Sequence, residues 1–414
     1  MKASILTIGT ELLIGQVIDT NSAWLGEQLN ALGIEIIEKR SVADKREMIV
    51  DTLDQLFKKS NIILITGGLG PTNDDITKKT LASYLDRKMY FDEKTYLKIS
   101  AYFNERNIPL QPAHKEQCNM PDGVTLLENN MGTAPGMWFE NDGNIIVSMP
   151  GVPSEMKYIF RNDLRRKLED SKIAAQIFHR TIHTAGTGET VLAGLIKDIE
   201  ENLPKGISIA YLPSVAQVRV RISGIAKEGT SLKKEILEIS EQIESRIKKY
   251  IYGYDGATLA SSIRDILKER NEKLTVAESC TGGYLSHLLV QTPGISEVYD
   301  GSITAYSYGL KESLLGVESE TLIQNGAVSE EVVIQMVQGC IKATKSNYAI
   351  SISGIAGPGG GTPDKPVGTV WVACGSKDKI QTKKLKLTKN RDMNIKYSAI
   401  LALILFRRLL VEEN

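Results

Sequence analysis

The chain has 414 residues with 50 basic and 50 acidic side chains, so its formal net charge is zero. The chain therefore lacks the excess of positive charge expected of a protein whose main partner is nucleic acid. Hydrophobic residues make up 42% and charged residues 24%, a composition that excludes a largely disordered chain. The length predicts three domains, each with a core of its own.

The four cysteines, Cys118, Cys280, Cys340 and Cys374, are widely spaced and form no CxxC pair. This spacing favours reduced thiols and a cytoplasmic location. The start of the chain, "MKASILTIGTELLIG", lacks the pattern of an export signal. The apolar run "YSAILALILFRRLL" near the other end is shorter than the ~20 residues that span a bilayer. We therefore predict a buried terminal helix and no membrane partner.

Short β-rich runs alternate with helical patterns from residue 1 to 168. The runs are "SILTIG", "IEIIEKRSV", "NIILITGG" and "NIIVSMPG", and the first helix is expected around "NSAWLGEQLNALG". Alternation of this kind predicts an α/β domain with a parallel sheet covered on both faces.

Residues 169–253 change in style. The expected order is strand, helix, two strands, and the charged helix "SLKKEILEISEQIESRIKKY". This order predicts a small α+β module that resembles a KH-like fold in order only. The loop that most resembles a glycine-bracketed RNA-binding loop is "TAGTGET". It contains Glu189, whose negative charge is unsuited to binding a phosphate backbone. A spacer or dimerisation role is therefore favoured over RNA binding.

Strands and helices alternate again in residues 254–414, which predicts a second α/β domain. Its stretch "VAESCTGGYLSHLL" has a strand that turns through glycines into a helix, which places free amides near a serine. Ser279 is either a nucleophile or, like Thr281, only the cap of the helix. His287 lies more than two helical turns from Ser279 and is too far to act as its base.

Lysine is the other base that suits a serine, because a buried lysine can lose its proton through desolvation. The candidate is Lys311 in "TAYSYGLKESLLGV". Cys280 is a stronger intrinsic nucleophile. However, neighbouring residues at a strand end point to opposite sides, so we expect Cys280 to be small, buried and inert.

Acidic residues and glycines gather at strand-to-helix junctions in "GTELLIGQVIDTNSAWL" and "ITGGLGPTNDDIT". Carboxylates there are suited to a divalent cation, and glycine amides are suited to phosphate. Ser154 in "MPGVPSEM" starts a further helix and can contact an anion. The alternative is that Asp19 and Asp74 only cap helices. The candidate metal ligands are Glu11, Asp19, Asp74 and Asp75, and the candidate phosphate contacts are Gly67, Gly68, Gly70, Thr72 and Ser154.

The motifs "AESCTGG", "YSYGLKESLLGV" and "SGIAGPGGGTPDKPVGTV" together resemble the deamidase domain of CinA-like proteins, the nicotinamide mononucleotide deamidases. The resemblance covers residues 255–414 and implies Ser279 as nucleophile, assisted by Tyr306 and Lys311. One departure is Tyr308, where the family often carries Asn. The expected reaction converts the substrate to nicotinate mononucleotide and ammonia without a cofactor. The expected substrate contacts are Glu278, Thr281, Gly282, Gly354, Gly357, Gly359 and Gly360.

The motifs "GGLGPTNDD" and "MPGVPSEM" resemble the CinA variant of the molybdopterin-binding fold. Asp75 falls where related cofactor enzymes carry the Asp of an Arg-Asp-x-Thr sequence, while Asp74 replaces the Arg. This loss of positive charge favours a pyrophosphate bridged by a divalent metal such as Mg²⁺ over molybdopterin itself. The resemblance thus implies an ADP-ribose pyrophosphatase. The alternatives are a domain that binds molybdopterin or is inactive, and a non-enzymatic protein associated with competence or DNA damage.

The sequence therefore predicts two three-layer α/β domains, the first molybdopterin-binding-like, joined by a small KH-like α+β module. We expect boundaries at 1–168, 169–253 and 254–414. The expected protein is a cytoplasmic homodimer that acts on nicotinamide mononucleotide and ADP-ribose in pyridine nucleotide salvage.

Overall fold

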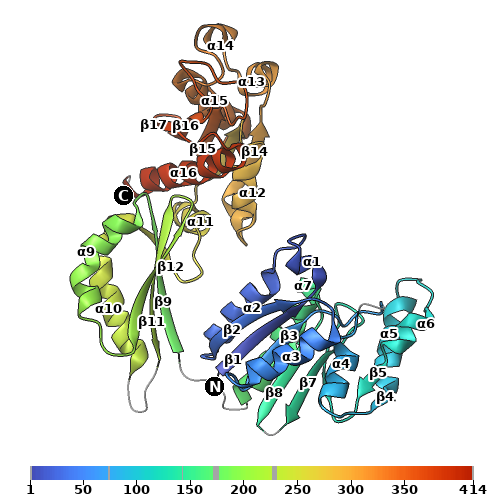
Figure 1. Ribbon diagram of the computed structural model, residues 1–414. Helices are drawn as coiled ribbons and strands as arrows, with labels where there is room; N and C mark the ends of the chain where they lie inside the picture. Colours follow the sequence, from blue (N-terminus) through green and yellow to red (C-terminus); the bar gives the residue numbers. More distant parts are fainter. Residues whose placement is uncertain (1, 73–74, 142, 171–176, 226–230, 413–414) are drawn as a thin grey trace. The chain divides into compact units, whose positions relative to one another are not determined.

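The computed structural model describes residues 2–72, 75–141, 143–170, 177–225 and 231–412 (Figure 1). The chain divides into two compact units. The first contains residues 1–178 and 224–232, and the second contains residues 179–223 and 233–414. The KH-like module thus belongs to the same unit as the carboxy-terminal domain.

The first unit is built on a six-stranded sheet in the order β2-β1-β3-β8-β7-β6. β1, β2, β3 and β8 run parallel, whereas β7 and β6 are antiparallel to their neighbours. The bounds are β1 Lys2–Ile8, β2 Glu35–Val42, β3 Ile62–Thr66, β6 Thr125–Leu127, β7 Gly136–Asn141 and β8 Asn144–Met149. The parallel part agrees with the predicted alternation, and the antiparallel edge was not predicted.

Helices cover both faces of this sheet (Figure 1). In β3, Ile62 and Leu64 enter one core, while Ile63 and Ile65 enter the other. This is the period-two alternation of a strand buried on both faces. The helices are α1 Thr10–Leu13, α2 Thr20–Ala31, α3 Arg46–Phe57, α4 Thr77–Tyr84, α5 Glu93–Asn104, α6 Pro112–Glu116, α7 Pro153–Ile159 and α8 Arg165–Asp170, with a π-helical turn over Phe160–Leu164. A separate ribbon pairs β4 Met89–Phe91 with β5 Asn119–Pro121.

The KH-like module has a four-stranded sheet in the order β10-β11-β9-β12. α9 and α10 lie together on one face (Figure 1). The predicted order is present, and the structure adds a strand that the sequence analysis did not identify, β12, which pairs antiparallel with β9. The bounds are β9 Ile177–Ala185, α9 Glu189–Glu201, β10 Ile207–Ser214, β11 Gln217–Ile225, α10 Leu232–Ile247 and β12 Ile251–Tyr254.

The carboxy-terminal domain has a five-stranded sheet in the order β14-β13-β15-β16-β17. β13 is parallel to both its neighbours, and β16 and β17 are antiparallel additions. The strands are β13 Leu274–Glu278, β14 Tyr299–Thr304, β15 Tyr348–Gly354, β16 Thr369–Ser376 and β17 Ile380–Lys386. The helices are α11 Leu259–Arg270, α12 Tyr284–Val290, α13 Tyr308–Leu315, α14 Ser319–Asn325, α15 Glu330–Thr344 and α16 Arg391–Glu412.

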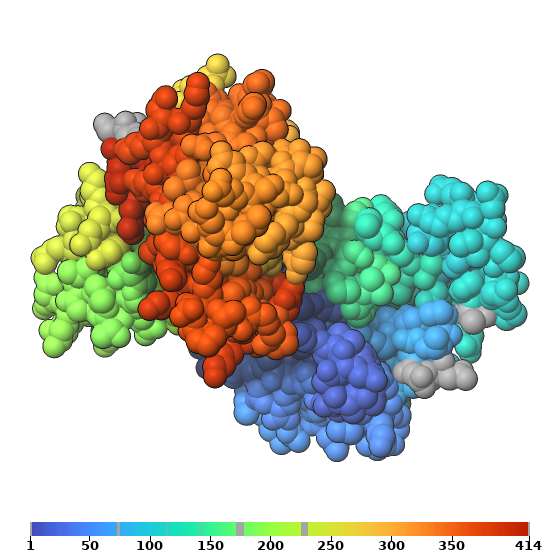
Figure 2. Space-filling model, turned by 90° about the horizontal axis from the view of Figure 1, so that it is seen from above, coloured from blue at the N-terminus to red at the C-terminus, as the bar shows by residue number. Residues whose placement is uncertain are grey.

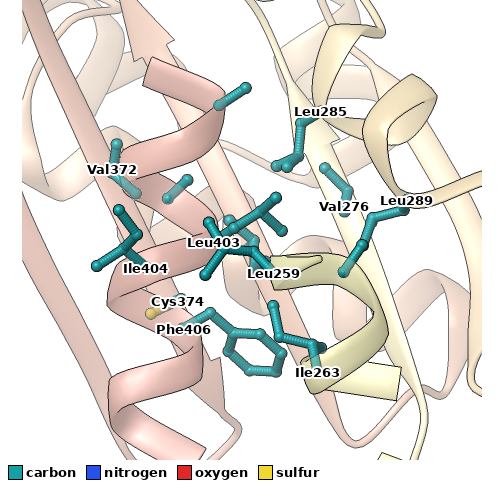
Figure 3. Close-up of a cluster of buried hydrophobic side chains, with 14 of the residues drawn as sticks. Leu259, Ile263, Val276, Leu285, Leu289, Val372, Cys374, Leu403, Ile404 and Phe406 are labelled. Carbon is teal, nitrogen blue, oxygen red and sulfur yellow. The ribbon is translucent and has the colours of Figure 1, made fainter. Parts of the chain in front are cut away.

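One face of this sheet packs against α11, α12 and α16. Figure 3 shows Leu259 and Ile263 of α11 facing Leu403 and Phe406 of α16. The other face carries α15 and α13, which bury a second cluster around Ala277. α16 is the predicted terminal helix, and it is buried against the sheet. In the described part of the chain, no helix has the length and apolar character needed to cross a membrane.

Candidate active sites

β13 lies between β14 and β15 in its sheet and delivers Ser279 to the carboxyl edge. The chain runs from β13 to β14 on one side and later returns to β15 on the other, so the strand order reverses at β13. Ligands of open α/β sheets bind in the crevice at such a point. The turn from β13 into α12 ends at Gly283, whose φ of 99° is in the left-handed region that favours glycine.

Ser279 and Lys311 come together at this edge. Lys311 Nζ donates to Ser279 Oγ at 3.0 Å, to the Ala305 carbonyl at 2.7 Å and to the Tyr306 carbonyl at 3.3 Å. Lys311 is 1% exposed, and burial lowers the pKa of its amine to about 8. Near neutral pH a fraction of the Lys311 amine is therefore unprotonated, and the neutral amine can accept the hydroxyl proton of Ser279.

Burial has the opposite consequence for the reactivity of Cys280. Its side chain is buried, and burial raises the pKa of the thiol to about 12. A thiol of this kind stays protonated at neutral pH and is a poor nucleophile. The environment therefore fits the expectation of an inert cysteine. His287 is hydrogen-bonded to Gln291 along α12, in keeping with its exclusion as the base.

The structure gives Glu278 a different role from the expected substrate contact. Its side chain is fully buried, and its carboxylate accepts from the amides of Gly283, Leu285 and Ser286 at 2.8 to 3.1 Å. Successive side chains of a strand alternate in direction, so Glu278 points beneath the turn while Ser279 points into the site. Glu278 therefore anchors the amino-terminal end of α12.

The amides available for an oxyanion also differ from the expectation. The Gly282 amide donates to the Ser279 carbonyl, so it is already used. Within the described part of the chain, the Thr281 amide makes no hydrogen bond, and neither does the buried Thr281 hydroxyl. These groups adjoin Ser279 and are suited to a developing negative charge.

Arg391, the first residue of α16, was not identified from the sequence. Its guanidinium donates to the Tyr306 hydroxyl at 3.2 Å and to the Gly357 carbonyl at 2.6 Å. It thereby ties the loop after β15 to the segment that precedes α13. Tyr306 is 59% exposed, so its ring is open to a ligand. The space-filling view shows the orange segment with α13 and α14 at the surface of this domain (Figure 2).

The expected glycine contacts divide into two kinds. Gly354 packs so closely on Val370 that a Cβ would lie 2.5 Å from the Val370 side chain. Packing therefore explains the glycine at this position. Gly357 is buried and presents its carbonyl to Arg391. Gly359 and Gly360 are exposed, and only these two leave open backbone for a ligand.

A cavity of about 750 Å³ lies at the carboxyl ends of β1, β3 and β8. The predicted Gly67, Gly68 and Gly70 line it. Gly67 has a φ of 114°, and a Cβ there would lie 2.0 Å from the Ile8 carbonyl, so the chain requires glycine. Glu11 and Asp75 also line this cavity, together with three residues that the sequence analysis did not select, Asp44, Gln117 and Glu155.

The other predicted residues of this domain lie elsewhere. Thr72 donates its amide and hydroxyl to the Asp75 carboxylate and so holds Asp75 in place. Asp19 accepts from the Ser22 amide at 2.9 Å, which is the capping alternative, and lines a smaller pocket. Ser154 is exposed and does not line the main cavity, and Asp74 lies outside the described residues.

The donor set of the cavity can be compared with the needs of a divalent metal. Among the described residues, no three His, Cys, Asp or Glu side chains are grouped to hold a metal by themselves. Mg²⁺ commonly takes only one or two carboxylates and completes its shell with water and substrate phosphates. The cavity can supply such carboxylates from among Asp75, Asp44, Glu11 and Glu155. Burial raises the pKa of the Glu155 carboxyl.

Three family profiles match consecutive parts of the chain. They are described as probable molybdopterin binding domain over residues 4–170, damage-inducible protein CinA KH domain over 179–253, and CinA C-terminal domain over 256–410. A CinA-like protein of Cytophaga hutchinsonii is 43% identical over 99% of this chain and 98% of its own length. The chain belongs to the CinA family.

A CinA-like protein of Salinibacter ruber is 38% identical over 99% of this chain and its own full length. A solved CinA superfamily protein of Klebsiella pneumoniae is 33% identical, covering 37% of this chain and 96% of its own, with a TM-score of 0.36. The predicted family and fold class, two α/β domains with a KH module between them, are confirmed. The exact domain boundaries remain predictions.

Proposed function

We propose that the carboxy-terminal domain hydrolyses the amide of nicotinamide mononucleotide. The observation that carries this is the 3.0 Å contact between Ser279 Oγ and Lys311 Nζ, in a lysine whose pKa is lowered to about 8 by burial. The choice of nicotinamide mononucleotide as the substrate rests on the motifs that this chain shares with CinA-like deamidases. The geometry supports amide hydrolysis because a nucleophile, its base and free oxyanion donors lie together.

Ser279 Oγ attacks the carboxamide carbon while its proton passes to the neutral amine of Lys311. The carbonyl oxygen becomes an oxyanion that the amide and hydroxyl of Thr281 stabilise. The C–N bond then breaks, and the Lys311 ammonium returns the proton to the departing ammonia. A water molecule attacks the resulting ester with Lys311 again as base, which releases nicotinate mononucleotide and restores Ser279.

Ammonia release from nicotinamide mononucleotide tests this function. We expect Ser279→Ala and Lys311→Ala to lose at least about 100-fold in kcat, since general-base and nucleophilic assistance each contribute on that scale. Cys280→Ala is the matched control and should retain activity. Full activity in Ser279→Ala together with loss in Cys280→Ala would assign the nucleophile to the cysteine.

We propose a second function for the first domain, metal-dependent hydrolysis of ADP-ribose to AMP and ribose 5-phosphate. Support comes from a single cavity that combines a glycine turn at Gly67–Gly70 with the carboxylates of Asp75 and Asp44. A bound divalent metal would neutralise the diphosphate and activate water. Asp75 and Asp44 would hold it, and the turn would bind the phosphates through the amides that follow Gly67, whose own amide donates to the Met149 carbonyl.

Three assays separate this function from its alternatives: ADP-ribose hydrolysis, molybdopterin binding and salt-dependent DNA binding. Asp75→Asn should abolish metal-dependent ADP-ribose hydrolysis while ammonia release by the other domain continues. Wild-type protein that binds molybdopterin without cleaving ADP-ribose would replace this function with cofactor binding. Tight, salt-sensitive binding to DNA without either hydrolysis would favour the non-enzymatic alternative.

A further inference from the structure

A glutamine in the wall of the amino-terminal cavity has a buried side chain without a partner. Gln117 is 3% exposed and lines the cavity. Neither its Nε2 nor its Oε1 makes a hydrogen bond with the part of the chain that the structure describes. Buried polar atoms are normally paired, because an unpaired one keeps its full desolvation penalty. A group on a ligand is therefore the natural partner of this amide.

The backbone of Gln117 is held from both sides. Its carbonyl accepts from Lys78 Nζ at 2.9 Å. The next residue, Cys118, is fully buried and donates its thiol to the His114 carbonyl at 3.4 Å. These contacts position the residue without using its side chain, so the amide is free to serve a ligand.

The charges of the cavity restrict what that ligand group can be. Four carboxylates line it, Glu11, Asp44, Asp75 and Glu155. The Lys78 amine contacts Gln117, but it is bound to the Gln117 backbone carbonyl. Burial lowers the pKa of this amine to about 8. A phosphate at Gln117 would engage only Nε2 and leave Oε1 unpaired. A neutral group with a donor beside an acceptor would satisfy both atoms.

The edge of adenine has this arrangement, with the N6 amino group as donor and N7 as acceptor. Gln and Asn make a bidentate pair with this edge. We infer that Gln117 reads the adenine base of the nucleotide in this cavity, with Nε2 donating to N7 and Oε1 accepting from N6. The inference deepens the proposed ADP-ribose hydrolysis and rests on it. It makes Gln117 a determinant of base specificity.

Inosine nucleotides provide a sharp comparison, because they carry an acceptor, O6, where adenine carries the N6 donor. We expect calorimetric titration of the full chain to show AMP bound more tightly than IMP by about 5- to 150-fold, the range of about 1–3 kcal/mol per bidentate pair. In Gln117→Leu, which keeps a similar volume, this ratio should fall to near one. Gln111→Leu is the matched control, because Gln111 is exposed and does not line the cavity.

The melting temperature of Gln117→Leu adds a readout that a structural role would move. Removing two unpaired buried atoms should leave it unchanged or raised. A lowered melting temperature, an equal loss of AMP and IMP binding, or wild-type protein that binds neither or does not distinguish them would overturn the inference. An AMP preference that Gln117→Leu retains, with ADP-ribose hydrolysis intact, would refute the base-reading role alone. Wild-type protein that prefers AMP but never cleaves ADP-ribose would refute only the proposed hydrolysis.

Discussion

Replacing Lys311 by methionine should leave the stability of the carboxy-terminal domain near pH 7 about unchanged while it removes the deamidase activity. The pKa of this amine falls from its usual 10.5 to about 8 because the side chain is buried. Near pH 7 the folded protein therefore carries a buried ammonium at a cost of about 3 kcal/mol. Methionine avoids this cost but gives up the hydrogen bonds to Ser279 and to the Ala305 and Tyr306 carbonyls, about 1 kcal/mol each. These contributions nearly cancel, so the expected net change in stability near pH 7 is about zero.

The sign of the pH dependence follows from which state holds the proton. Below about pH 8 both folded and unfolded wild type are protonated at Lys311, so the full cost is present. Between about pH 8 and 10.5 only the unfolded state keeps the proton, and the wild type becomes relatively more stable. Relative to the wild type, Lys311→Met should therefore lose stability as pH rises through this window.

Denaturant-dependent hydrogen exchange of peptides from β13 measures this, because it reports on the unfolding of this domain in the full chain. Wild type and Lys311→Met should be compared near pH 7 and near pH 10. Lys311→Ile is a matched control of similar size. A Lys311→Met protein that is several kcal/mol less stable near pH 7, with no change in the difference at higher pH, would refute the reasoning. It would mean that the ammonium stabilises the fold.

Three further outcomes are expected. The value of kcat/KM for nicotinamide mononucleotide should rise with pH and reach half its maximum near the Lys311 pKa of about 8; a flat pH–rate profile would count against Lys311 as base. Glu278→Ala should lower the melting temperature and the activity, because three amides of α12 lose their acceptor at about 1–3 kcal/mol each; an unchanged melting temperature would exclude this anchoring role. Gly67→Ala should destabilise the first domain by at least about 1 kcal/mol while ammonia release continues; equal damage to both activities would contradict separate sites.

The proposed nucleophile and base of the carboxy-terminal domain could be chosen from the sequence because chemistry limited the candidates. A serine at a strand end needs a base, His287 is out of reach, and Lys311 remained as the candidate supported by the family resemblance. The position of Glu278 was harder to derive. Its carboxylate is adjacent to Ser279 in sequence, but the alternation of side chains along β13 sends it under the turn, where it meets three amides.

Other site residues carried no local signal. Arg391 reaches Tyr306 across 85 positions of sequence, and only the packing of α16 on the sheet brings them together. Asp44 follows β2, Glu155 lies in the first turn of α7, and Gln117 comes just before β5, so no motif joins them. Asp44 and Glu155 reach the cavity because parallel strands end at one edge of the sheet, whereas Gln117 comes from the segment before the separate β4–β5 ribbon. Alternation of strands and helices predicted that sheet, but not the antiparallel edge that completes it.

The nucleophile of the carboxy-terminal domain can be identified directly by rapid acid quench during turnover of nicotinamide mononucleotide, followed by peptide mass spectrometry. Acid preserves an ester between the substrate acyl group and the enzyme long enough for its site to be read. The expected result is an acyl adduct on Ser279, with none in Ser279→Ala and an unchanged adduct in Cys280→Ala. An adduct on Cys280, or full turnover by Ser279→Ala, would contradict the assignment of Ser279 as the nucleophile.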